Sequence, residues 1–135
     1  MDSVRQSWNV MYMNSNSASI TKRFFPNVYT RISCHHFYTN FKITQILTGH
    51  RNFKKYLNRF NLCTNSVCDC TVGGDEDVEH ILFLCSKFIP QRNVLKLALK
   101  KLNINYWPPT MNNLISSKSS FVYFINYIED TYKSF

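Results

Sequence analysis

The chain has 135 residues, 44% of them apolar and 16% aromatic, which predicts one folded domain rather than a disordered chain. No run of about 18 apolar residues occurs, so we expect no membrane-spanning segment. The N-terminus lacks the basic and apolar regions of a signal peptide, so we expect a nuclear or cytoplasmic protein that is not secreted.

The formal charge of +8 is unevenly distributed along the chain. Residues 3–68 contain nine lysines and arginines and no acidic residue, whereas four of the eight carboxylates lie within residues 75–79. Such a basic surface favours a nucleic acid or another polyanion as the partner. A charge that serves only solubility is the alternative.

Residues 1–35 form the least regular part of the chain. The pattern predicts a short helix near Trp8, followed by a polar loop over residues 14–19. An extended segment is expected around Pro26, because the residue before a proline avoids helical geometry. Its apolar side chains predict an anchor in the core: Phe24, Phe25, Val28 and Tyr29.

Residues 36–105 are expected to form a helical core. The spacing of apolar residues predicts a helix from His36 to Leu47, and Gly49 suits a left-handed cap at its C-terminus. A second helix is predicted over residues 51–60, where Phe53, Tyr56, Leu57 and Phe60 recur at i, i+3, i+4 and i+7.

The other face of the 51–60 segment carries four cations, Arg51, Lys54, Lys55 and Arg59. A solvated helix face is the ordinary interpretation of this pattern. The absence of interspersed carboxylates favours a surface that contacts phosphates. Tyr56 or an exposed aromatic residue could stack on a base, although their helical spacing favours packing in the core.

Residues 61–74 are expected to form a loop that turns at Gly73 and Gly74. A helix capped by Asp75 should then run to about Leu84. A further helix should begin near Pro90 and pack through one apolar face, made of Val94, Leu95, Ala98 and Leu102.

Residues 106–135 are expected to form a C-terminal helical tail. Proline residues 108 and 109 should end the preceding helix, and Thr110 should cap a short helix that reaches Ile115. The last predicted helix, residues 120–133, carries an apolar stripe of Phe121, Phe124, Ile125 and Ile128.

The most specific motif is Cys68, Cys70, His80 and Cys85, a C-x-C-x9-H-x4-C arrangement. Three thiolates and one imidazole form a closed tetrahedral set for a structural Zn²⁺ ion. In an ideal helix Cys85 would lie about 140° around the axis from His80, so we expect it where the helix ends or distorts. The alternative interpretation is three buried cysteines and a hydrogen-bonded histidine.

The remaining thiols give weaker signals. Five cysteines in a chain expected to stay inside the cell argue against a disulfide framework, and Cys68 and Cys70 are too close for ordinary disulfide geometry. Cys63 is a possible competing ligand. Cys34, with the adjacent His35 and His36, has few partners nearby and is interpreted as structural or incidental.

Catalytic motifs are not evident in the sequence. Two-metal nucleases and polymerases need carboxylates that converge from several elements, and residues 3–68 contain none. Neither a glycine-rich phosphate loop nor a nucleophile elbow occurs. We therefore expect a protein that is not an enzyme.

A resemblance to a known family follows the order of these motifs. It comprises residues 44–50 (TQILTGH), Phe53, Tyr56-Leu57, Arg59-Phe60, the two cysteines of the C-x-C pair, the stretch from Asp77 to Cys85, and Arg92. Trp8 and residues 21–26 match upstream elements. The chain resembles the C-terminal segment of Pol polyproteins from arthropod non-LTR (LINE-type) retrotransposons, without the reverse transcriptase and ribonuclease H domains.

The resemblance implies a CCHC zinc module on Cys68, Cys70, His80 and Cys85, with a nucleic-acid-binding role in reverse transcription. Together with the residue patterns, it predicts a mostly α, small irregular helical domain, residues 1–135, organised around one structural zinc site. The expected partner is RNA or single-stranded DNA, contacted by Arg51, Lys54, Lys55 and Arg59. The alternatives are a structural tail that docks on a reverse transcriptase through residues 121–128, or a non-functional remnant.

Overall fold

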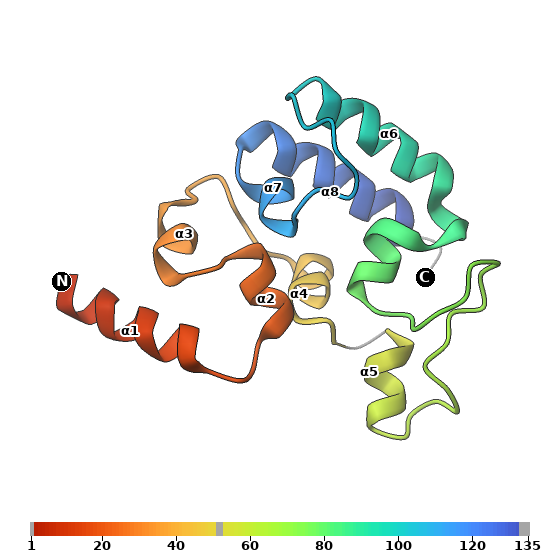
Figure 1. Cartoon of the computed structure of the whole chain (residues 1–135), viewed down its shortest axis with the longest axis horizontal. Coiled ribbons are helices and arrows are strands. Elements are labelled where there is room, and N and C mark those ends of the chain that lie inside the picture. Colours follow the sequence, from red (N-terminus) through yellow and green to blue (C-terminus); the bar gives the residue numbers. More distant parts are fainter. Residues whose placement is uncertain (1, 51–52, 133–135) are drawn as a thin grey trace.

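The computed structural model describes residues 2–50 and 53–132 and is mostly helical (Figure 1). Within these residues no β-strand forms, and one antiparallel bridge joins Val67 and Asp75. The predicted mostly α fold class is therefore confirmed. The helices, in chain order, are α1 (Asp2–Asn14), α2 (Ser19–Phe24), α3 (Val28–Ser33), α4 (Phe41–Thr48), α5 (Lys54–Arg59), η1 (His80–Leu84), η2 (Ser86–Phe88), α6 (Ile89–Lys100), α7 (Met111–Ile115) and α8 (Lys118–Tyr132).

Helix α8 lies in the middle of the apolar core and packs on α4, α6 and α7. Its buried stripe includes Phe121, Phe124 and Ile128, as predicted, with Tyr127 also buried and Ile125 partly exposed. The hypothesis that this stripe is a free partner face is wrong, because the other helices already cover it. None of the helices among the described residues combines the length and apolarity needed to cross a membrane.

Helix α6 faces the core differently from the predicted orientation. Pro90 lies in its first turn, as predicted, and Leu95 and Leu99 are buried. Val94, which was predicted to pack, is 68% exposed, and Arg92 is buried in its place. The helix is rotated so that the Arg92 guanidinium reaches the backbone of η1.

The predicted extended segment around Pro26 is confined to residues 25–27, where Phe25 (φ −124°, ψ 92°) and Asn27 (φ −149°, ψ 168°) have extended backbone. Helices α2 and α3 flank it. Asn27 starts α3 with a capping box: its side chain accepts a hydrogen bond from the backbone N–H of Thr30, and the Thr30 hydroxyl accepts one from the N–H of Asn27. This local cap starts α3 at Val28, two residues after the proline. Phe24 and Phe25 are buried, whereas Tyr29 is 44% exposed.

Helix α4 begins at Phe41, five residues later than the predicted start at His36. The side chain of Asn40 accepts a hydrogen bond from the backbone N–H of Ile43 at 2.9 Å, which fixes this start. Gly49 ends the helix with φ +70°, as predicted. At α7 the predicted cap is also present, because Thr110 Oγ1 accepts a hydrogen bond from Asn113 N.

Helix α5 buries less of its apolar face than its amphipathic pattern predicts. Phe53, at its N-terminus, is fully buried, but Tyr56 and Leu57 are half-buried and Phe60 is 52% exposed. Figure 1 shows α5 beside the long loop that follows it, away from α6 and α8. One aromatic edge of this short helix therefore remains accessible.

Candidate metal centre

The first two cysteines of the motif lie in a tight turn between Ser66 and Glu76. The backbone N–H of Cys68 donates to Gly74 O at 2.8 Å, and that of Gly73 donates to Cys70 O at 3.3 Å. Gly73 and Gly74 have φ values of +72° and +86°, a left-handed backbone that favours glycine. This turn carries Cys68 and Cys70 on one side of the loop.

The other two side chains come from η1, which is a π turn. The backbone N–H of Cys85 donates to His80 O at 2.7 Å, which closes a hydrogen bond across five residues. Cys85 itself is extended and ends the turn. The expectation that Cys85 lies where the helix ends or distorts agrees with this geometry.

The cap of this helical segment differs from the predicted one. The Asp77 carboxylate, not that of Asp75, accepts a hydrogen bond from the backbone N–H of His80 at 2.9 Å. Asp75 instead belongs to the bridge with Val67 and accepts a hydrogen bond from the Ser66 hydroxyl at 2.6 Å. The bridge ties Asp75 to the loop of residues 66–76 (the metal loop), so helical geometry begins after Asp77.

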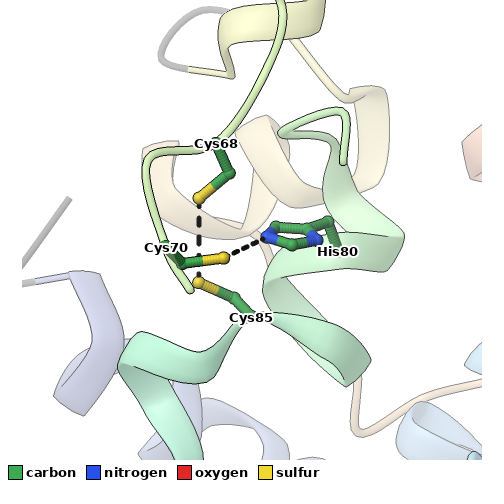
Figure 2. A group of neighbouring side chains, drawn as sticks. All are labelled: Cys68, Cys70, His80 and Cys85. Carbon is green, nitrogen blue, oxygen red and sulfur yellow. Dashed lines mark hydrogen bonds between the residues drawn. The ribbon is translucent and has the colours of Figure 1, made fainter. Parts of the chain in front are cut away.

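The four side chains of the motif converge (Figure 2). Cys68 Sγ and Cys85 Sγ lie 3.9 Å apart, Cys70 Sγ and His80 Nε2 lie 3.3 Å apart, and all four donor atoms are within 4.8 Å of one another. A tetrahedral ion with bonds of about 2.3 Å to sulfur needs donors roughly 3.8 Å apart. The donor set therefore fits a metal ion with little rearrangement.

The surroundings of the three thiols shift their pKa values in different directions. Burial raises the pKa of Cys68 to about 12 and also raises that of Cys85. Burial also opposes ionisation of Cys70, but hydrogen bonds from the backbone at Ser86 and Gly73 outweigh it and lower its pKa to about 5. Without a metal, Cys70 is therefore the thiol that ionises first.

A buried arginine supports the π turn. Arg92, 5% exposed, donates from Nη2 to Cys85 O at 2.8 Å and from Nε to Leu82 O at 3.2 Å. The hydroxyl of Tyr127 donates to Ile81 O at 2.6 Å, and burial raises the pKa of Tyr127 to about 12. Sequence reasoning assigned no role to either residue, although Arg92 was part of the family pattern. Together they satisfy carbonyls that a π turn leaves free.

The remaining thiols lie outside this cluster. Cys63 Sγ donates to Asn65 O at 3.0 Å, so the structure does not place it among the candidate ligands. Cys34 Sγ is 3.3 Å from His36 Nε2, which lies 2.7 Å from Ile115 O. These contacts fasten the segment before α4 to α7. A second group, of Cys68, Asp69 and Glu76, shares its thiol with the main cluster, and Asp69 is paired with Lys87.

The predicted cations of the 51–60 segment have different surroundings. Arg51 lies outside the described residues. Lys54 Nζ donates to Val67 O at 3.4 Å, and Lys55 Nζ lies 3.7 Å from Asp77 Oδ2 and 4.0 Å from Asp75 Oδ2. The Arg59 guanidinium lies 5.6 Å from the centre of the Phe60 ring.

The fold therefore brings carboxylates to a helix that has none in its own sequence. Glu76 also binds the start of α5: its backbone O accepts from Lys55 N at 3.1 Å, and its Oε1 accepts from Lys54 N at 3.3 Å. The metal loop thus caps α5 and neutralises part of its charge. Sequence order could not reveal this, because the contacts with Asp75, Glu76 and Asp77 join residues 20 to 22 positions apart.

These features define a small, mostly helical protein with a three-cysteine, one-histidine cluster that could hold a metal ion. The chain is 30% identical over 98 residues, 71% of its length, to "Retrovirus-related Pol polyprotein from type-1 retrotransposable element R1 2" of Nasonia vitripennis. It is 31% identical over 104 residues, 75% of its length, to "Putative 115 kDa protein in type-1 retrotransposable element R1DM" of Drosophila melanogaster.

These similarities confirm the predicted resemblance to Pol proteins of non-LTR retrotransposons. The matched segments cover 23% and 10% of the two relatives, so the chain spans a small part of the proteins it resembles. No family model matches the chain. No solved structure matches it either.

Proposed function

We propose that this protein is a non-catalytic, zinc-binding module that binds nucleic acid and derives from a retrotransposon Pol protein. The observation that carries the proposal is the docking of the basic helix α5 on the loop that bears Cys68 and Cys70. A metal held by Cys68, Cys70, His80 and Cys85 would fix this loop, and with it the position of the cations. The similarity to Pol proteins supports a nucleic acid as the partner.

Zinc is the ion that this donor set favours. Soft thiolates with one imidazole in a four-coordinate arrangement suit Zn²⁺, and four protein ligands leave no position for a reacting water. The metal would then act in folding and not in chemistry. Thiolate ligands require a reducing compartment, so we propose the nucleus or cytoplasm.

The metal is tested on purified protein by elemental analysis. We expect one zinc ion per chain, and less than a tenth of that in Cys70→Ser. Cys63→Ser is the matched control, because it removes a thiol outside the cluster and should keep the full zinc content. Purified wild-type protein with no zinc, or equal loss in the two variants, would contradict the zinc site.

Binding of nucleic acid is tested by fluorescence anisotropy with a labelled single-stranded RNA, its DNA counterpart and a DNA duplex. Affinity should fall as salt rises, and Lys55→Gln with Arg59→Gln should reduce the salt slope for single strands by about 1.4. The control double variant, Lys100→Gln with Lys101→Gln, removes the same charge from exposed positions at the end of α6. Absence of binding at low salt, or equal loss in both double variants, would overturn the proposed role. The test should be extended to Arg51 and Lys54, the other two predicted contacts.

A second candidate is a module that docks on a reverse transcriptase. Exposed apolar side chains on α1 favour it, since Trp8 is 56% exposed and Met11 is 72% exposed. This surface replaces the buried α8 stripe as the candidate partner face. Co-purification with the polymerase that is lost in Trp8→Ser, without any nucleic-acid binding, would favour this second function.

A further inference from the structure

A cleft of about 790 Å³ lies beside the metal loop, between residues 16–21, the end of α4 and helix α5. Its wall includes the rings of His50 and Tyr56 and the cations Lys55 and Arg59. The volume is within the range of clefts that hold small ligands. Residues 16–21 and Asp77 also line the cleft, so its wall combines aromatic, cationic, acidic and polar residues.

The rings form a small stacking surface. The His50 and Tyr56 ring centres are 4.5 Å apart with an angle of 24° between their planes, so the rings are stacked. The Phe60 ring centre is 5.0 Å from that of Tyr56. His50 is exposed, Tyr56 is half-buried and Phe60 is 52% exposed. These rings are thus partly open to solvent, although the helical pattern predicted that Tyr56 and Phe60 face the core.

The cations of the cleft differ in how far they are neutralised. Lys55 is shared between two carboxylates, those of Asp75 and Asp77. Within the described part of the chain, Arg59 has no ion pair, and its guanidinium lies over the Phe60 ring. Arg59 therefore offers its charge to an outside anion next to an exposed aromatic surface.

We propose that this cleft binds one unpaired nucleotide of a single-stranded nucleic acid. Its base stacks on the His50–Tyr56 pair, and its phosphate contacts Arg59. A base within a duplex has both faces covered by its neighbours, so this site selects unpaired nucleotides. The inference rests on the proposed nucleic-acid binding and assigns it a specific site and a preference for single strands.

The test compares a labelled 12-nucleotide oligothymidine with a labelled 12-base-pair DNA duplex. Removal of one stacking ring costs about 1–3 kcal/mol per base, so Tyr56→Leu should weaken binding of the single strand by about tenfold. The affinity for the duplex should stay within about twofold of wild type, and the salt slope should not change. Tyr56→Phe keeps the ring and should bind normally. Tyr29→Leu is the matched control, since Tyr29 is 44% exposed on α3 and does not line the cleft.

Circular dichroism and zinc content first establish that each variant is folded like wild type. If Tyr56→Leu is not, His50→Ala, at an exposed position, replaces it and should give the same selective loss. Single-strand binding equal to wild type, or an equal loss for single strand and duplex, would overturn the base site and leave the proposed function intact. No binding of either probe by the wild-type protein would overturn both.

Discussion

The spacing between His80 and Cys85 explains the unusual backbone of the candidate metal centre. In an α-helix, residues five apart point about 140° away from each other, which would separate the two donors. The π turn hydrogen bond from Cys85 N to His80 O brings both residues to one side of the turn. The local departure from α-helix is therefore what allows this spacing to serve one metal ion.

The unequal thiols predict how metal binding depends on pH. Cys68, with a pKa of about 12, and Cys85, whose pKa is also raised by burial, are protonated at pH 8, whereas Cys70, with a pKa of about 5, is ionised. Zinc must therefore displace about two protons from thiols. Because low pH favours the protonated, metal-free form, the apparent zinc affinity should rise with pH.

Calorimetric titration of the metal-free protein with zinc at pH 8 gives the number of protons released, when it is repeated in buffers of different ionisation enthalpy. We expect about two protons. A value near zero would mean that the thiols are already ionised, or that they do not bind the ion. A flat dependence of affinity on pH between 6 and 8 would likewise contradict the assignment.

Replacement of Arg92 should reduce the stability of the protein more than replacement of an exposed arginine would. Replacement by Met leaves the carbonyls of Leu82 and Cys85 without this donor inside the core. Lost hydrogen bonds from a charged group, with buried acceptors left over, should cost about 2–3 kcal/mol in the free energy of unfolding. Urea denaturation of the zinc-loaded protein measures this cost.

The control for Arg92→Met is Arg23→Met. Arg23 Nη2 lies 3.5 Å from Glu79 Oε1, but both side chains are more than 40% exposed, so this pair should contribute less than about 1 kcal/mol. Similar unfolding midpoints for the two variants would show that the carbonyl contacts of Arg92 contribute little.

At the scale of single elements, local caps decide where the helices begin and end. Asn27, Asn40 and Thr110 each start a helix through a side-chain acceptor, and Gly49 ends α4. The caps at Gly49 and Thr110 could be predicted, because they adjoin clear apolar periodicity. Those at Asn27 and Asn40 were missed: the sequence offers several polar residues at each place, and tertiary packing selects among them.

The left-handed backbone of Gly49 predicts what replacement of this residue does to stability. Its φ of +70° is unfavourable for an L-residue, although an added Cβ would meet Ile20 Cγ1 at 3.5 Å and Val78 Cγ2 at 3.6 Å, which are ordinary contacts. Gly49→Ala should therefore destabilise the protein by about 1–2 kcal/mol through backbone strain. Gly49→Asn should cost less, because asparagine tolerates this conformation. Urea unfolding curves in which Gly49→Asn is less stable than Gly49→Ala would contradict this explanation.

Across the whole molecule, features that depend on one short stretch of sequence could be predicted. Features that depend on contacts between distant segments could not. The cluster of Cys68, Cys70, His80 and Cys85 could be recognised as a candidate metal site because its chemistry and spacing lie within one short stretch. The ion pairs of Lys55 with Asp75 and Asp77 could not be predicted, because they form only after the loop folds back onto α5. The buried position of Arg92 depends in the same way on the docking of α6 against η1.

Removal of the metal should therefore affect the molecule unevenly. The loop of residues 66–76 has few buried apolar side chains, so a zinc ion bound as proposed would be its main constraint. Helix α5 should loosen with the loop, because Glu76 of this loop caps the start of α5. The stripe of α8, with Phe121, Phe124 and Ile128 nearly fully buried, has its own apolar support from α4, α6 and α7.

Hydrogen–deuterium exchange before and after treatment with a zinc chelator separates these parts. We expect amide exchange over residues 54–85 to become at least about tenfold faster, whereas residues 121–128 stay protected, because local opening follows the number of buried contacts. Re-addition of zinc should restore the slow exchange. Uniform loss of protection would mean that the metal folds the entire chain, and unchanged exchange over residues 66–85 would remove the structural role of the metal.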